Sequence, residues 1–88
     1  MITSTNNVGL QVQAKDVHFD GNILCIALSD GREIRLPMDQ MDWLQWLAKA
    51  TNTQRAKWTI EPGGYAIYWE ELDDGVEIEH LLGMRPLT

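Results

Sequence analysis

The stretch VHFDGNILCIALSDGREIRLP, residues 17–37, decides the fold because it holds three strand patterns separated by two turn signals. The turn signals are DGN at 20–22 and SDGR at 29–32, and Asp-Gly pairs of this kind are typical of tight hairpins. Between them, Ile23–Leu28 is apolar on both faces, which predicts a central strand covered on both sides. With Glu33–Leu36 as the third strand, two consecutive hairpins predict an antiparallel meander.

The segment before this stretch predicts the first strand of the meander. Apolar and polar residues alternate from Val8 to Ala14, and the alternation restarts at Val17 and Phe19. Such a pattern indicates a strand that is buried on one face. Residues 1–7 are polar, and we expect them to form a loose N-terminus.

A helical insert is expected after the meander. Pro37 ends the sheet, because proline cannot donate a ladder hydrogen bond. Asp39 is a suitable N-cap for a helix that runs to about Ala50. A second, shorter helical turn follows, with Thr51 or Thr53 as its cap.

The last third of the chain predicts further strands. Residues 58–60 and 65–69 are of the aromatic and β-branched type favoured in strands, and the EPGG turn at 61–64 separates them. Alternation at 76–79 indicates another strand, and HLLGM at 80–84 a final helical turn or a tucked tail. The expected fold class is α+β: a mostly antiparallel sheet, made of the meander and the later strands, with the helical insert packed on one face.

Length and charge limit the classes of function. The 88 residues predict a single domain over positions 1–88, and the formal net charge of −6 argues against direct nucleic-acid binding, which needs clustered Lys and Arg. A basic protein partner suits this charge better. The longest apolar run falls far short of the roughly 20 residues of a membrane span. With one cysteine and no signal peptide, we expect a cytoplasmic protein.

An acidic loop, residues 70–79, is the strongest candidate for chemistry. Four carboxylates follow a run of aromatic residues: Glu70, Glu71, Asp73 and Asp74. A calcium loop needs oxygen ligands at alternating positions, and Leu72 and Val76 interrupt that alternation. We expect a solvated loop in which Asp73 caps a turn. The sequence therefore predicts no catalytic residue, no metal ligand and no cofactor.

The histidines and the cysteine show no ligand spacing. His18 and His80 stand alone in the sequence, whereas zinc motifs carry ligands two to four residues apart. Cys25 lies in the most apolar strand, where a thiol usually behaves as an inert small hydrophobe. We expect neither metal binding nor nucleophilic chemistry from these three residues.

The helix predicted over residues 41–50 has an unusually wide apolar surface. Its apolar side chains cover roughly 220°, about twice the stripe of a single core-facing helix. The edge expected to face the sheet carries Met41, Leu44, Leu47 and Ala48. The other edge carries Trp43 and Trp46, with Ala50 beside them. These tryptophans either form an exposed partner interface or pack over the following QRAKW segment and close the core.

The order of these motifs, from VHFDGNILCIALSDGREIRLP to the LDDG element and the paired leucines, resembles a family of small bacterial proteins catalogued as domain of unknown function 2442. The resemblance covers about residues 17–83. Tyr68 and Glu70 stand where members commonly have His and Pro. The main matching positions are Asp30, Gly31, Arg32, Pro37, Gln54, Arg55, Trp58, Trp69 and Asp73.

The function expected from these observations is protein binding without catalysis. The resemblance implies no established activity, but it implies the antitoxin half of a toxin–antitoxin pair, because members are often encoded beside a second small protein. The expected partner is therefore a second copy of the chain or a small protein from a neighbouring gene. The alternative is a small-molecule or metal-binding domain, or an enzyme, that uses the acidic loop.

Overall fold

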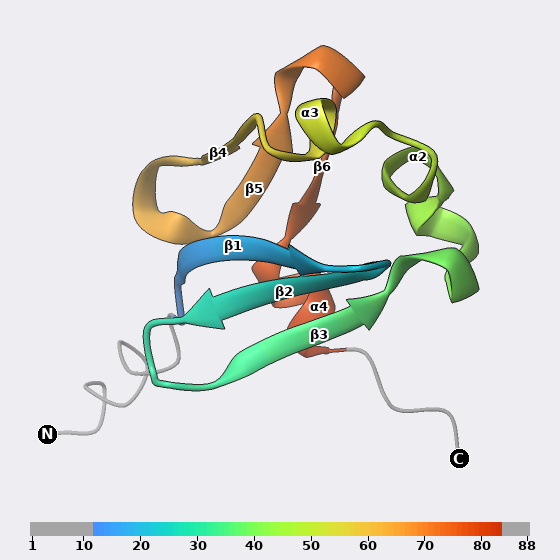
Figure 1. Cartoon of the computed structure of the whole chain (residues 1–88). Coiled ribbons are helices and arrows are strands. Elements are labelled where there is room, and N and C mark those ends of the chain that lie inside the picture. Colours follow the sequence, from blue (N-terminus) through green and yellow to red (C-terminus); the bar gives the residue numbers. More distant parts are fainter. Residues whose placement is uncertain (1–11, 84–88) are drawn as a thin grey trace, which may run out of the picture.

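The predicted meander forms a three-stranded antiparallel sheet, sheet A, in the computed structural model, which describes residues 12–83. Sheet A consists of β1 (Ala14–Asp20), β2 (Ile23–Leu28) and β3 (Glu33–Pro37), with β2 in the middle (Figure 1). The strands lie where the turn and alternation signals place them, so the meander is confirmed. The expectations for residues 1–11, a loose terminus and the start of the first strand, lie outside the described residues.

Glycines close both hairpins of sheet A. Gly21 has a φ of 61° and Gly31 a φ of 93°, a left-handed conformation that glycine adopts without a steric penalty. In the first hairpin only Gly21 and Asn22 separate the paired residues Asp20 and Ile23. This two-residue loop fixes the register of the β1–β2 ladder.

The later strands form a second sheet, sheet B, instead of extending sheet A. Its order is β4 (Trp58–Ile60), β5 (Ala66–Trp69) and β6 (Asp74–Glu77), and all pairs are antiparallel. Two short turns connect these strands, η3 (Pro62–Gly64) and η4 (Glu70–Leu72). The fold class is α+β, as predicted. No helix in the described part of the chain has the length and apolar character needed to cross a membrane.

The last strand ends earlier than the sequence predicts. The alternation at 76–79 was expected to continue the strand, but helix α4 (Ile78–Leu82) begins there. The N–H of Ile78 donates to the carbonyl of Tyr65 (2.8 Å) at the end of the ladder. Ile78 and Leu81 are both buried in the core. Residues three apart share a face of a helix but not of a strand, so burial of both favours the helix.

The prediction of one long helix from Asp39 to Ala50 is wrong. The insert consists of four short segments: η1 (Met38–Gln40), η2 (Asp42–Leu44), α2 (Gln45–Ala48) and α3 (Asn52–Arg55). Met41 is extended (φ −118°, ψ 114°) and interrupts the helix. The side-chain amide of Gln45 donates to the carbonyls of Met38 (3.2 Å) and Met41 (3.1 Å). These carbonyls also accept from the N–H groups of Met41 (3.2 Å) and Leu44 (3.0 Å), so Gln45 adds a second donor to each of them at the break.

The two predicted caps have different outcomes. Asp39 lies inside η1, because Pro37 occupies the N-cap position and offers no side-chain cap. Thr51 caps α3, as predicted: its hydroxyl accepts from the N–H of Gln54 (3.0 Å), and the Gln54 side chain accepts from the N–H of Thr51 (3.0 Å). This capping box satisfies two otherwise free donors.

The core lies between the two sheets, with the insert at one end and α4 behind sheet A in the view of Figure 1. Its largest fully buried side chains come from all of these elements: Trp69, Leu24, Ile26, Met38, Leu44, Leu47, Ile67 and Ile78. Trp69 packs edge-to-face against Phe19 of sheet A and against Trp46 of the insert. One indole therefore links the three parts of the fold.

Arg55 joins the insert to both sheets. Its residue exposure is 8%, and its guanidinium donates to the carbonyls of Leu47 (3.1 Å), Ala48 (2.7 Å) and Gly21 (3.4 Å). Its own carbonyl accepts from the indole N–H of Trp69 (2.9 Å). The carbonyls of Leu47 and Ala48 lie at the end of helix α2, so Arg55 donates to its C-terminus as a positively charged group.

Candidate functional site

The positions that carry the family resemblance lie in turns, at the ends of strands and where the insert packs against sheet B. The carboxylate of Asp30 accepts from the backbone N–H (3.0 Å) and the Nε (2.7 Å) of Arg32. These donors hold the pKa of Asp30 below its usual range. Together with Gly31 they shape the β2–β3 turn, and Pro37 is the last residue of β3.

A second group of these positions surrounds the buried Trp69. Gln54 completes the capping box of α3, and Arg55 accepts the indole hydrogen bond. Trp58 is paired with Trp69 in the β4–β5 ladder. These residues stabilise the packing of the insert against sheet B, and the structure does not gather them into one reactive centre.

The acidic loop is held by local bonds. The hydroxyl of Tyr68 donates to Asp73 (2.6 Å), Lys57 pairs with Glu71 (2.7 Å), and Asp74 accepts from the next backbone N–H (2.8 Å). The hydrogen bond to Asp73 raises the pKa of Tyr68. Asp73 ends η4 in a left-handed conformation (φ 53°). In the described part of the chain, these carboxylates form no group that could hold a metal ion.

The two tryptophans of the insert point in different directions. Trp43 is 38% exposed and lies edge-on to His80, with the ring centroids 5.7 Å apart. Trp46 is half-buried against Trp69, and its indole N–H donates to the carbonyl of Trp43 (2.9 Å). Ala50 also packs on the core. Of the two open alternatives, Trp46 and Ala50 follow the core interpretation, and Trp43 follows the surface interpretation.

A groove of about 480 Å³ lies beside Trp43, over the outer face of sheet B. Its lining includes Trp43, His80, Tyr68, Glu61 and Glu77. Gly75 also lines the groove and packs closely on the neighbouring strand β5. A Cβ there would collide with the carbonyl oxygen of Ile67 and the backbone of Tyr68.

An adjoining hollow of about 810 Å³ shares Ala66 and Glu77 with this groove. It adds Tyr65, which is 47% exposed, and Leu82, which is 38% exposed. Each of the three large apolar side chains that are exposed in the described chain therefore lines one of the two hollows. Neighbouring exposed apolar side chains of this kind are typical of an association surface.

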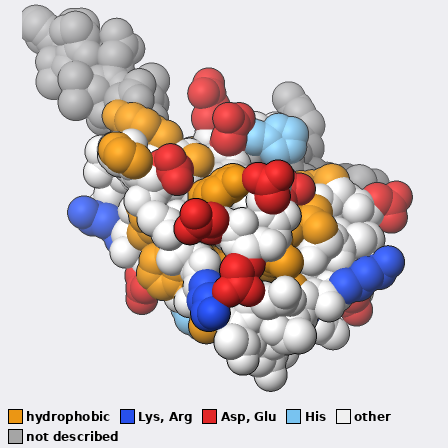
Figure 2. All heavy atoms as spheres, turned by 90° about the horizontal axis from the view of Figure 1, so that it is seen from above, with side chains coloured by type: hydrophobic (Ala, Val, Ile, Leu, Met, Phe, Trp, Pro, Cys, Tyr) orange, Lys and Arg blue, Asp and Glu red, His pale blue; other side chains and the backbone are white. Residues whose placement is uncertain are grey.

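The groove is acidic as well as apolar. Glu61 and Glu77 are both exposed at its lining, and the carboxylate of Asp73 is bonded to the hydroxyl of Tyr68. Figure 2 looks down on the end of the molecule where sheet B lies and shows acidic side chains standing among exposed hydrophobic ones. With the net charge of −6, this surface favours a cationic ligand.

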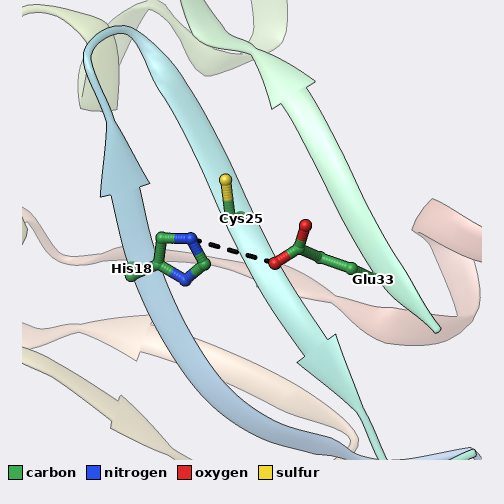
Figure 3. A group of neighbouring side chains, drawn as sticks. All are labelled: His18, Cys25 and Glu33. Carbon is green, nitrogen blue, oxygen red and sulfur yellow. Dashed lines mark ion pairs between the residues drawn. The ribbon is translucent and has the colours of Figure 1, made fainter. Parts of the chain in front are cut away.

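Sequence reasoning missed one cluster. The sequence predicts that His18 stands alone and that Cys25 is an inert small hydrophobe, but the structure brings both together with Glu33 on the outer face of sheet A (Figure 3). Their donor atoms all lie within 4.8 Å of one another. The signal was present in the sequence, because a two-residue turn at Gly21 and Asn22 places position 18 opposite position 25.

Comparison with known proteins agrees with this fold. The chain is similar to the crystal structure of a protein of unknown function from Rhodospirillum rubrum, with 23% identity, a TM-score of 0.66, and coverage of 81% of this chain and 84% of that one. It is also similar to the solution structure of an uncharacterized protein from Chromobacterium violaceum, with 25% identity, a TM-score of 0.67, and coverage of 90% and 74%.

No curated protein matches the chain. The family model described as "Protein of unknown function (DUF2442)" matches residues 14–86, somewhat more than the region expected from the motifs. The order of turn, proline, Gln-Arg pair and tryptophans that carries the resemblance is thus a family property, and the chain belongs to the DUF2442 family of proteins of unknown function.

Proposed function

We propose that this protein is a non-enzymatic binding domain whose groove takes a basic segment of a partner protein. The observation that carries the proposal is Trp43, an exposed indole fixed edge-on against His80 at the wall of an open groove. Tryptophan dominates the energetics of protein interfaces because it buries a large area with few rotatable bonds.

Charge supports a partner of different composition over a second copy. Glu61 and Glu77 line the groove, so two copies meeting through this face would bring like charges together. A segment with an apolar anchor flanked by Lys or Arg would fill the apolar part and pair with both carboxylates. The family resemblance suggests its source: a small protein encoded beside this one, as a toxin is beside its antitoxin.

The local bonding of the acidic loop supports a role without catalysis. The carboxylates of Asp73, Glu71 and Asp74 accept from Tyr68, Lys57 and the backbone, respectively. Paired carboxylates in acid–base catalysis need environments that separate their pKa values, and an exposed loop lacks such environments.

Co-expression with the neighbouring gene product tests the proposal. We expect the two proteins to co-elute in gel filtration, and we expect Trp43→Ala and Glu77→Lys each to weaken binding at least tenfold, about 1.4 kcal/mol, by calorimetry. Asp39→Lys is the matched control for Glu77→Lys, because Asp39 is also exposed but lines neither the groove nor the adjoining hollow.

Two results would contradict the proposal. Separate elution of the two proteins would exclude the neighbouring partner. A homodimer that Trp43→Ala dissociates would replace the basic partner by a second copy of the chain.

A further inference from the structure

Three adjacent strands each place a donor side chain on the outer face of sheet A. His18 comes from β1, Cys25 from β2 and Glu33 from β3, and Figure 3 shows the imidazole and the carboxylate on either side of the thiol. His18 is directly opposite Cys25 in the ladder. The imidazole Nε2 and Glu33 Oε2 are 3.8 Å apart, and all three donor atoms lie within 4.8 Å of one another.

The spacing of these atoms is close to that of a tetrahedral metal site. With metal–ligand bonds of roughly 2.0–2.3 Å, neighbouring ligands in such a site lie about 3.5 Å apart. Cys25 is fully buried in the central strand, so its sulfur has a fixed place. The side chains of His18 and Glu33 are 55% and 37% exposed, so small rotations of both would close the remaining gap.

Arg35 holds the carboxylate in a suitable orientation. It is paired with Cys25 in the β2–β3 ladder, and its Nη1 donates to Oε1 of Glu33 (3.3 Å), while Oε2 faces His18. Oε1 of Glu33 therefore accepts a hydrogen bond from Arg35, and Oε2 stays directed at His18. Partners of this kind orient ligating carboxylates in metal sites.

The local charge also favours a cation. Arg35 is balanced by Asp20, to which its Nη2 donates (3.0 Å), and by Glu33. One guanidinium thus faces two carboxylates, and deprotonation of Cys25 would add a further negative charge at the centre of the cluster.

We propose that the outer face of sheet A binds a zinc ion through the thiolate of Cys25, the imidazole of His18 and Oε2 of Glu33. Zinc is the metal that suits this mixture of sulfur, nitrogen and oxygen donors. Three protein ligands leave one position for water or for a donor from another molecule. This site lies on a different sheet from the groove of the proposed function, so the two are independent.

Metal binding at this site must displace the thiol proton. Burial raises the pKa of Cys25, the charges of Glu33 and Asp20 raise it further, and Arg35 lowers it. Zinc binds the thiolate, so its apparent affinity falls as the pH falls and protons compete for the sulfur.

Titration of the metal-free full chain with Co²⁺, followed by competition with Zn²⁺, tests the site. We expect a saturable thiolate-to-cobalt charge-transfer band with one ion per chain, lost on addition of zinc. Cys25→Ser should abolish the band. His18→Ala and Glu33→Gln should each weaken Co²⁺ binding at least tenfold, and His80→Ala is the matched histidine control.

The exposed ligands keep the test decisive even if Cys25→Ser fails to fold. His18 and Glu33 are on the surface, so their variants are expected to retain the wild-type circular dichroism spectrum. The absence of a saturable band in the wild type would overturn the proposal. A band of unchanged affinity in both His18→Ala and Glu33→Gln would also overturn it, because it would indicate capture by the thiol alone.

Discussion

At the scale of single residues, Arg55 shows how a buried cation is held by main-chain oxygens. Its guanidinium bonds three carbonyls and lies 5.6 Å from the centroid of the Phe19 ring. Hydrogen bonds to a charged group stabilise more than neutral ones, and loss of the donor leaves buried acceptors unsatisfied. The family position at 55 therefore has a structural explanation that requires no ligand.

We expect Arg55→Ala to lower the free energy of unfolding by about 3 kcal/mol, because the carbonyls of Leu47 and Ala48 lose the charged donor and the buried guanidinium leaves a gap against Phe19. Urea unfolding followed by tryptophan fluorescence measures the change. Arg32→Ala is the control, since an exposed ion pair contributes about 1 kcal/mol or less. Equal losses in the two variants would show that burial of Arg55 is not what matters.

Tyr68 gives the molecule a pH dependence at alkaline pH. Its hydroxyl donates to Asp73, which raises the folded-state pKa of Tyr68 above the ordinary value of 10.0. The neutral phenol is therefore favoured by folding. Its contribution is complete below pH 10 and is lost as the pH rises through the higher folded-state pKa.

We expect Tyr68→Phe to remove this part of the alkaline fall in stability, because phenylalanine carries no titrating hydroxyl. Thermal unfolding between neutral pH and pH values above that of free tyrosine measures it. Tyr65→Phe removes the hydroxyl of another exposed tyrosine and serves as the control. If the two variants show the same alkaline profile, the bond to Asp73 has no effect on stability.

At the scale of elements, the insert shows why a helical pattern does not guarantee a continuous helix. Met38 directly follows β3, the last strand of sheet A, and is fully buried, as is Leu44. The extended conformation of Met41 separates the turns that carry these two side chains, and the side chain of Gln45 bridges the break by donating to the carbonyls of Met38 and Met41. The periodicity of the sequence correctly predicted that Leu44 and Leu47 face the core, but tertiary packing decided that the backbone forms short turns and not one helix.

The close packing of β5 against β6 in sheet B depends on the missing side chain of Gly75. A Cβ at this position would collide with the carbonyl of Ile67, so we expect Gly75→Ala to lower the free energy of unfolding by about 1–3 kcal/mol. Gly83→Ala is the control, because its Cβ would lie 3.5 Å from the nearest atom, at an ordinary contact distance. Urea unfolding compares them, and a neutral Gly75→Ala would mean that the sheet relaxes around the methyl group.

At the scale of the whole molecule, we expect acidity to govern association with the proposed basic partner. The net charge of −6 and the carboxylates at the groove predict that binding of a basic partner is steered electrostatically. We expect its association rate to fall at least tenfold between low salt and about 0.5 M salt, while the dissociation rate changes less. Stopped-flow fluorescence of the tryptophans measures both rates. A salt-independent association rate would contradict an electrostatic role for the groove.

The two sites also differ in how far the sequence predicts them. The groove depends on the orientation of Trp43, which the sequence left open between two alternatives. The cluster of His18, Cys25 and Glu33 follows from hairpin register, which the turn at residues 20–22 encodes, although ligand spacing along the chain does not reveal it. Spacing rules describe ligands on one segment, whereas a ladder brings together residues from three.

The sequence by itself determined the meander, strands β4 and β5, and Thr51 as one of two candidate caps for α3, because alternation, Asp-Gly turns and caps act between near neighbours in the chain. Only the tertiary structure decided the break at Met41 and the opposite fates of Trp43 and Trp46. The positions of the two tryptophans depend on contacts with His80 of α4 and with Trp69, which lie far away in the sequence. At the break, burial of Met38 and Leu44 outweighs the local preference for a continuous helix.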